Sequence, residues 1–335
     1  MGDPMAYLLA FLKYVIYGLS IFFTAELEST VDVLDILALR FLLSFLFIWL
    51  LKTLGIFKIR LTVRELFSGG EREKHIPALL LAAMFEPVLY MLFETLGILF
   101  TTSITAAVIL SLTPITNCIA EELILKEKST LIEKIFLTLG CLGVIYIAVN
   151  GSSQGGEDSI IGVVFMLFAV ICSTLFCVFS RKSSKNFAPL EITYASSMLG
   201  ALIFNAVNIV RHIAARDILH YFDPFFSLPN LVGFVFLGIV CAVLASVVGN
   251  YCLSRMQISV TAAFTGVSTL VSVIAGVFLR DERMYFYHFV GLSLIALRMI
   301  GVTLISARRE KKKKEENEGA KKSKNDTISA PYGTK

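Results

Sequence analysis

Charged side chains are scarce in this sequence of 335 residues. Asp, Glu, Lys and Arg together make up 17% of the chain, whereas a soluble globular domain contains about 25%. Apolar residues make up 56%, above the roughly 45–50% of a typical soluble domain. Both values depart from the soluble range in the same direction. The composition therefore excludes a two-domain soluble enzyme and indicates a protein that crosses a membrane several times.

The sequence also lacks the motifs of common enzymes. It contains no HExxH, no P-loop and no GxSxG, so zinc hydrolysis, ATP-driven pumping and serine hydrolysis are without their usual parts. His212 and Asp217 form an HxxxxD spacing that resembles an acyltransferase signature, but no companion motif accompanies it. The chain is therefore not predicted to be an enzyme, and no cofactor is predicted.

Paired cysteines and a cleavable leader are absent as well. The six cysteines all lie inside apolar runs and form no CxxC pair, which predicts packing residues rather than disulfides or a metal site. The first apolar run lacks a basic segment before it and is followed by further runs, so no signal peptide is expected.

Ten long apolar runs are present instead. About 20 apolar residues in a helix cross the hydrocarbon core, and lipid offers no partner for unpaired backbone groups, so each run is predicted to be helical. The runs do not alternate as barrel strands would. Their approximate bounds are 6–25, 33–51, 76–98, 103–124, 132–149, 160–180, 189–210, 230–252, 259–279 and 286–306.

Basic residues are distributed unevenly between the connecting segments. With a cytoplasmic N-terminus, 23 of the 30 Lys and Arg residues fall in inside segments, 4 fall in outside segments, and the remaining three lie within runs. Positive charge is enriched on the cytoplasmic side of membrane proteins. The distribution therefore predicts that both termini are cytoplasmic.

The ten runs read as five that are repeated. Ile104–Ala107 opens the fourth run and Val260–Ala263 opens the ninth in the same pattern, and each run ends in a charged turn. Gly143 and Gly301 then lie at matching depth in the runs that follow. Because five is odd, the second copy enters the membrane in the opposite orientation, as in many secondary transporters. We expect an all-α integral membrane protein with repeats at 1–150 and 151–306.

Several residue patterns resemble the ten-helix EamA-type branch of the drug/metabolite transporter superfamily over nearly all of residues 5–306. In the first half, the matching landmarks are Tyr17-Gly18, Arg40-Phe41, Glu86–Tyr90 to Glu94, Thr101–Ser103, Ala106-Ala107, Pro114 and Glu127. In the second half they are Asn250-Tyr251, Leu253, Thr261–Ala263 and Glu282. Two positions depart from the family pattern: Leu270 stands near a common proline, and Arg298 stands where the first half has Gly140.

The resemblance implies a function as well as a fold. It implies a secondary transporter that moves small organic metabolites, such as amino acids or related solutes, through a central cavity by alternating access. Expected partners are a small-molecule substrate and the lipid bilayer of the cell membrane, with proton coupling as an option and no nucleic acid. The substrate, the direction of transport and the oligomeric state stay open.

The third run carries the strongest candidate site. Glu86, Tyr90 and Glu94 are spaced at i, i+4 and i+8 and therefore share a helix face. An ionisable side chain in the membrane costs roughly 2.5–3.5 kcal/mol on insertion scales, so Glu86 or Glu94 is predicted to bind an amine or carry a proton. The alternative for Glu86 is an ion pair with Arg40 that only fixes packing, and Glu94 can simply reach the external interface.

Other polar side chains are candidates for the walls of the same site. They are Tyr17 and Arg40 in the first two runs, Thr113 and Asn117 in the fourth, Ser246 and Asn250 in the eighth, and Thr265 in the ninth. Hydrogen bonding between helices is the alternative for Asn117. Lys13 is predicted to extend to the cytoplasmic surface. Arg298 can pair with a glutamate, neutralise an anionic substrate or extend to the headgroups.

The last segment, 307–335, is basic and low in aromatic residues, which predicts a disordered cytoplasmic tail. This tail supports a second hypothesis from another class: a membrane scaffold or sensor that recruits partners without transport. A membrane-bound acyltransferase that uses His212 is a third.

Overall fold

The structure is a computed structural model of the whole chain, and it describes residues 4–56, 59, 75–100, 106, 109–127, 129–151, 159–279 and 285–328. No strand occurs in these residues. Some sequence landmarks lie outside the described residues: Thr101–Thr105, Ala107, Lys128 and the segment 280–284, which includes Glu282.

Helices fill both halves of the chain. The first half contains α1 (Pro4–Glu28), α2 (Val33–Thr53), α3 (Ile76–Ala83), η2 (Met84–Leu89), α4 (Tyr90–Phe100), α6 (Thr113–Ala120), η3 (Glu121–Leu125) and α7 (Leu131–Gly151). The second half contains α8 (Ile160–Ser183), α9 (Pro189–Ala215), the short turns η4 (Ile218–His220) and η5 (Asp223–Phe226), α10 (Leu228–Val235), η6 (Phe236–Ala245), α11 (Ser246–Arg255), α12 (Ile258–Ala263), α13 (Thr265–Leu279) and α14 (Phe286–Ile328).

Eight helical stretches in the described residues are long and apolar enough to cross a membrane. They are Met5–Glu28, Val33–Thr53, Ile76–Ile98, Ile160–Ser183, Pro189–Ala215, Leu228–Arg255, Ile258–Ala275 and Phe286–Ser306. The other two predicted runs correspond to α6 with η3, whose preceding residues are only partly described, and to the 21-residue helix α7. The sequence prediction of an all-helical membrane protein is confirmed, with eight of the ten spans present by these criteria.

Local sequence signals explain where several helices begin. The Asp32 side chain accepts a hydrogen bond from the Leu34 N–H at 2.9 Å, and the Ser159 hydroxyl accepts one from Ile161 at 3.3 Å. The Glu191 carboxylate in the first turn of α9 accepts from the Ala188 N–H at 2.9 Å. Each side chain satisfies an N–H group that the first turn of a helix leaves unpaired.

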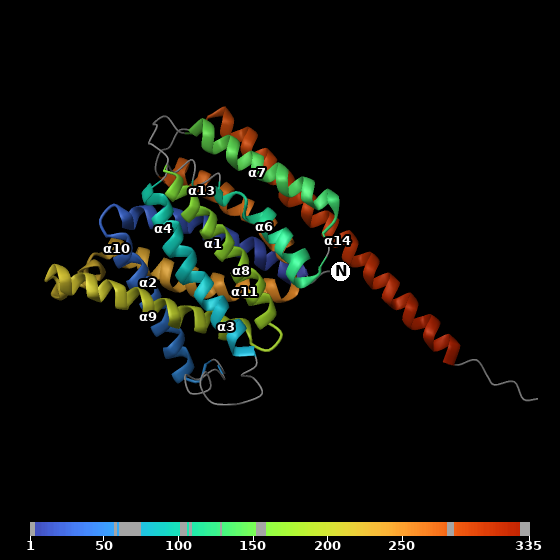
Figure 1. The fold of residues 1–335 in the computed structure, drawn as a ribbon, viewed down its shortest axis with the longest axis horizontal. Helices are drawn as coiled ribbons and strands as arrows, with labels where there is room; N and C mark the ends of the chain where they lie inside the picture. Colours follow the sequence, from blue (N-terminus) through green and yellow to red (C-terminus); the bar gives the residue numbers. More distant parts are fainter. Residues whose placement is uncertain are drawn as a thin grey trace, which may run out of the picture.

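The contacts between helices are related by an exchange of the two halves of the chain, and Figure 1 shows one such contact, between the equivalent helices α7 and α14. Six of the contacts form three equivalent pairs. The contact of α1 with α13 matches that of α8 with α6, and the contact of α4 with α8 matches that of α11 with α1. The contact of η6 with α2 matches that of η2 with α9. The pairs α2–α9 and α7–α14 each join equivalent helices. Every one of these contacts maps onto another, or onto itself, when the first-half and second-half helices are exchanged. The helices of the two halves are therefore arranged as two related sets.

The contact between α7 and α14 shows the same relation at residue level. A β-carbon placed on Gly143 would lie 2.9 Å from Cβ of Leu294, and one placed on Gly301 would collide with the ring of Phe136. Gly301 and Leu294 each lie 158 residues after their counterparts Gly143 and Phe136. The two glycines, predicted to lie at matching depth, therefore receive matching side chains from opposite repeats.

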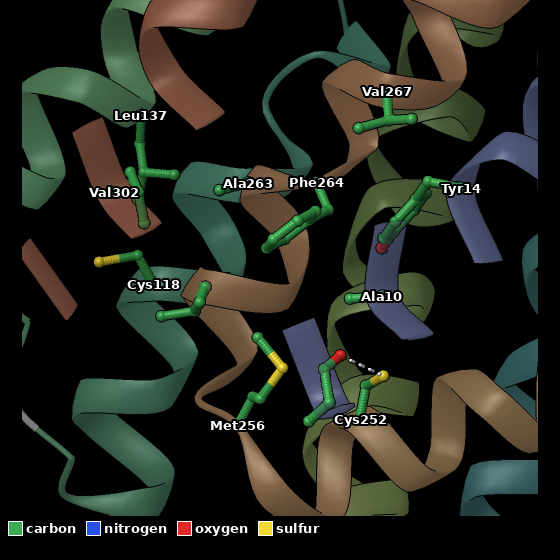
Figure 2. Close-up of a cluster of buried hydrophobic side chains, with 12 residues drawn as sticks. Ala10, Tyr14, Cys118, Leu137, Cys252, Met256, Ala263, Phe264, Val267 and Val302 are labelled. Atoms are coloured by element: carbon green, nitrogen blue, oxygen red, sulfur yellow. Dashed lines mark hydrogen bonds between the residues drawn. The ribbon is translucent and has the colours of Figure 1, made fainter. Parts of the chain in front are cut away.

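The two halves share a buried apolar core. Figure 2 shows one cluster in which Cys118 and Leu137 of the first half meet Met256, Phe264 and Val302 of the second. None of the six cysteines forms a disulfide, and five of them are buried. They are packing residues, as the sequence indicated, although the Cys252 thiol also donates to the Ala6 carbonyl at 3.4 Å, as drawn in Figure 2.

The last helix is longer than a membrane span. α14 runs from Phe286 to Ile328 and projects beyond the other helices in Figure 1. Residues 307–328, for which composition predicts disorder, are helical here. Lys, Glu and Ala dominate this stretch, and these residues have high helix propensity.

Candidate functional site

The third membrane helix is interrupted at Glu86. Between α3 and α4 the chain forms the π-helical turn η2, in which Glu86 has an extended backbone with φ −139° and ψ 123°. Pro87 follows directly and has no N–H to donate to the helix ladder. Interruptions of this kind leave backbone groups free and recur at functional sites in membrane helices.

A matching interruption lies in the second half. α3 and α10 are each eight residues long, and a π-helical turn, η2 or η6, follows directly after each. η2 packs on α8 and α9, and η6 packs on α1 and α2. Both interruptions therefore face helices of the opposite repeat, at the junction of the two halves.

Three charged side chains interact electrostatically near this junction. Glu86 is half-buried, and its charge interacts with Lys13 of α1 and Arg40 of α2. The Arg40 guanidinium lies 4.8 Å from the centroid of the Phe41 ring and 3.8 Å from the Met91 sulfur. Arg40 forms no ion pair with Glu86 among the contacts of the described residues. The structure thus gives no support to the alternative in which this pair only fixes packing.

Tyr90 and Glu94 continue the same helix face. The Tyr90 hydroxyl donates to Oε1 of Glu94 at 2.7 Å, as the i, i+4 spacing allows. Arg40 also interacts electrostatically with Glu94. Tyr17 of α1 interacts with the side chain of Ser246 of α11, so these five side chains come from α1, α2, α4 and α11.

The other residues predicted for the site lie outside this group of side chains. Asn250 is buried, accepts from Ser180 at 2.7 Å and donates to Thr193 at 3.0 Å. It therefore joins α11 to α8 and α9. Thr113, the first residue of α6, donates to the Leu110 carbonyl that precedes the helix, and Asn117 of α6 is buried with its Oδ1 atom unsatisfied within the described residues.

Thr265 is the partner of Arg298. The Arg298 side chain is only 2% exposed and donates to the Thr265 hydroxyl at 2.8 Å. It fills the space beside Gly140, where a β-carbon would collide with it. This burial rules out extension to the lipid headgroups, and it explains why the residue matching Arg298 in the first half is a glycine.

Sequence reasoning missed Lys13 as a site residue. Its Nζ atom does not extend to a surface: it lies 4.8 Å and 5.0 Å from the ring centroids of Tyr14 and Tyr17, and a β-carbon on Gly249 would lie 2.8 Å from it. The glycine opposite Lys13 was the available signal, because Gly249 opens the space that the ammonium occupies.

Ion pairs join the two halves at the end predicted to be cytoplasmic. Arg181 of α8 donates two hydrogen bonds of 2.8 Å to the Glu127 carboxylate and also reaches the carbonyls of Leu253 and Met256 at the end of α11. The fully buried Glu121 accepts from the first N–H groups of α12 at 2.8 Å and 3.1 Å. Arg309 of α14 pairs with Glu133 of α7 at 3.0 Å.

A second polar network joins the halves at the opposite end. Asp35 of α2 accepts from Asn208, Arg211 and His212 of α9 at 2.7–2.8 Å. His212 therefore uses Nε2 in a helix-to-helix contact, and its Nδ1 atom meets the backbone oxygen of Asp217 at 3.1 Å, not the carboxylate. The HxxxxD spacing forms a structural contact in this arrangement.

The chain belongs to the EamA-like transporter family, whose model matches residues 4–149 and 160–307. The two matches fall on the two halves seen in the packing. The resemblance to the drug/metabolite transporters is confirmed, and the chain is a multi-pass membrane protein of a transporter family.

Relatives with curated names are similar over much of the chain. The uncharacterized transporter YcxC of Bacillus subtilis is 32% identical over 317 residues, covering 95% of this chain and 97% of its own length. An uncharacterized transporter of Archaeoglobus fulgidus is 23% identical and covers 70% of this chain and 79% of its own. One solved crystal structure matches with a TM-score of 0.70 at 14% identity, covering 92% of this chain and 99% of that one, which supports the fold.

Proposed function

We propose that the chain is a secondary transporter that moves small organic metabolites, such as amino acids or related solutes, across the cytoplasmic membrane. Export is one of the directions in which it could move them. The observation that carries this proposal is the position of Glu86: a half-buried carboxylate in a helix interruption, at the junction of two repeats. Ionisable groups at such positions mark substrate or ion pathways, and midplane sites at interrupted helices are typical of transporters built from repeats.

Transport in this proposal is by alternating access between inverted repeats at 1–150 and 151–306, with both termini cytoplasmic. The end networks support this mechanism, because each one links the two repeats at opposite ends of the bundle. Opening one end requires breaking one network while the other persists. Glu86 then binds an amine or exchanges a proton at the centre.

The test is solute flux in proteoliposomes with a panel of amino acids, amines and organic acids. Flux above that of empty liposomes is expected for at least one solute. An imposed pH gradient that drives the flux supports a proton on Glu86, and indifference to the gradient identifies a facilitator. The absence of flux for every solute would contradict the transporter proposal.

Two variants separate the transporter from the other hypotheses. Deletion of residues 310–335, which keeps the Arg309–Glu133 pair, leaves the flux of a transporter intact but abolishes the activity of a scaffold that recruits partners. His212→Ala removes the activity of an acyltransferase, whereas a transporter retains its flux once it is folded. The contact of His212 with Asp35 makes a detergent unfolding measurement the necessary companion to this variant.

A further inference from the structure

The Lys13 side chain lies inside the bundle, in space left by a glycine of the opposite repeat. It runs from α1 to the backbone of α11, where a β-carbon on Gly249 would lie 2.8 Å from Nζ and 2.9 Å from Cε. The rings of Tyr14 and Tyr17 lie on the same ammonium at 4.8 Å and 5.0 Å from their centroids. These contacts position the charge but do not neutralise it.

Lys13 and Glu86 are opposite charges that do not bind each other. They interact electrostatically, yet within the described residues neither side chain forms a hydrogen bond or an ion pair of 4.0 Å or less. Charges removed from water need partners with good geometry. Because neither charge has a hydrogen-bonded partner among the described residues, each is available to a group of a bound solute.

The repeat shows that packing does not require the charge of Lys13. Gly97 lies 21 residues after the first residue of α3, and Gly249 lies 21 residues after the first residue of α10. A β-carbon on Gly97 would collide with the side chain of Met166 on α8, just as one on Gly249 would collide with Lys13 on α1. α8 and α1 are the first helices of their repeats, so Met166 and Lys13 occupy equivalent places.

Methionine therefore satisfies the packing at one of two equivalent sites. Met166 is fully buried in an apolar cluster, and both side chains are long and unbranched. The difference between the two sites is the ammonium. A charged group in the membrane interior that packing does not need has a functional explanation by default.

We propose that Lys13 binds a carboxylate of the transported solute while Glu86 binds its ammonium, so that the site selects zwitterions. This inference rests on the proposed transport function and deepens it. A zwitterion inserted between the two side chains gives each charge a hydrogen-bonded partner, and the two charges offset each other when the site is empty. A solute with only an amine satisfies Glu86 but leaves Lys13 without an anion.

The experiment compares wild-type protein with Lys13→Met in proteoliposomes. The solutes are the proteinogenic amino acids and, for each one transported, the decarboxylated amine and the deaminated acid. A charge-assisted hydrogen bond is worth roughly 1.5–3 kcal/mol, so flux of the zwitterion at low concentration is expected to fall roughly 10- to 100-fold in Lys13→Met. Flux of the amine is expected to stay at its wild-type level.

Two further variants control for structure. Met166→Leu changes the equivalent side chain without changing any charge and is expected to keep the preference for zwitterions. Gly249→Ala keeps the Lys13 charge but displaces its Nζ atom, and is expected to weaken zwitterion flux selectively. Detergent unfolding temperatures close to wild type are expected for Lys13→Met, because Met166 shows that methionine fits this environment.

The outcomes separate this inference from the transporter proposal. If Lys13→Met moves a zwitterion as well as the wild type, or if the wild type prefers the amine, the role of Lys13 is overturned and transport stands. If the wild type moves only solutes that are not zwitterions, the inference fails in the same way. If the wild type moves no solute, the proposed function fails with it.

Discussion

At the scale of single residues, the structure separates polar groups that cross-link helices from charged groups that have no hydrogen-bonded partner among the described residues. Asn250, Asp35 and Arg298 have hydrogen-bonded partners on neighbouring helices. Glu86 and Lys13 have none among the described residues, although their charges interact. The hydrogen bonds between helices stabilise the bundle, and in our proposal the charges of Glu86 and Lys13 bind the solute.

One residue-scale prediction concerns pH and the segment between α9 and α10. His220 is exposed, and its Nδ1 atom lies 2.6 Å from the Asp223 carboxylate. This hydrogen bond raises the pKa of His220 above its ordinary value, so its contribution to stability is complete below the unfolded-state pKa of about 6.5. The contribution is lost as pH rises through the folded-state pKa.

The measurement is the unfolding temperature of wild-type protein and His220→Gln in detergent, at about pH 5.5 and about pH 8.5. The wild type is expected to be the more stable of the two at acidic pH, and the difference is expected to shrink at alkaline pH. The effect is small because the pair is exposed and screened by solvent. A difference that grows with pH would contradict the assignment.

The residues also show what could be predicted from the sequence. The i, i+4 spacing placed Tyr90 beside Glu94, and the structure has that hydrogen bond. Lys13 was assigned to the surface because it lies near the start of its helix, and spacing along one helix does not reveal a glycine on another. Asn250 was predicted to reach the site. Its partners Ser180 and Thr193 lie on other helices, so the sequence did not reveal that Asn250 is hydrogen-bonded between helices.

At the scale of helices, the membrane spans follow directly from the apolar runs, because lipid requires helices wherever the chain crosses it. The interruptions do not follow from hydropathy. Pro87 signals the break in η2, but η6 contains no proline and forms over a continuous apolar stretch. Its position becomes understandable only from the repeat, since it lies where η2 lies in the other half.

The helices α7 and α14 approach each other closely at Gly143, and this contact gives the second prediction. A β-carbon on Gly143 would lie 2.8 Å from the backbone oxygen of Gly291 and 2.9 Å from Cβ of Leu294. Neither is the flexible end of a side chain, so Gly143→Ala is expected to destabilise the protein by about 1–3 kcal/mol, the usual range for overpacking. Thermal unfolding in detergent measures the change.

The matched control lies on the same helix. Ile135 is 58% exposed on α7, and Ile135→Ala is expected to change the unfolding temperature much less than Gly143→Ala. Equal effects of the two substitutions would show that the helices do not approach each other at Gly143.

At the scale of the whole molecule, the two repeats are joined at both ends by polar networks and at the centre by the charged site. The sequence indicated the repeat from short matching segments, and the two family matches and the exchanged helix contacts agree with it. The networks at the ends were not predicted, because each depends on residues from both repeats meeting in space.

The network around Arg181 gives the third prediction. Arg181→Gln removes the pair with Glu127 and the contacts with the end of α11. The half-buried Cys177 interacts electrostatically with Glu86 and Lys13 near the centre. In a variant that retains only this cysteine, labelling by a membrane-impermeant maleimide from the cytoplasmic side is expected to increase in Arg181→Gln.

Lys134→Gln is the control for that experiment. Lys134 pairs with Glu122 at 2.8 Å, at the same predicted end of the molecule, but both residues belong to the first repeat. Its loss leaves the contact between repeats intact, so labelling of Cys177 is expected to stay at the wild-type level. Labelling that rises equally in both variants would show that Arg181 does not hold this end closed.

The most direct test of the central claim is solute flux by Glu86→Gln in proteoliposomes. The comparison requires that this variant inserts into the liposomes in the same amount as the wild type and has the same unfolding temperature. The substitution keeps the size of the side chain and removes its charge, so flux is expected to be abolished or to lose its dependence on the driving gradient. Glu122→Gln, in a carboxylate far along the chain at the predicted cytoplasmic end, is expected to keep normal flux. Wild-type flux in Glu86→Gln would remove Glu86 from the mechanism and contradict the account.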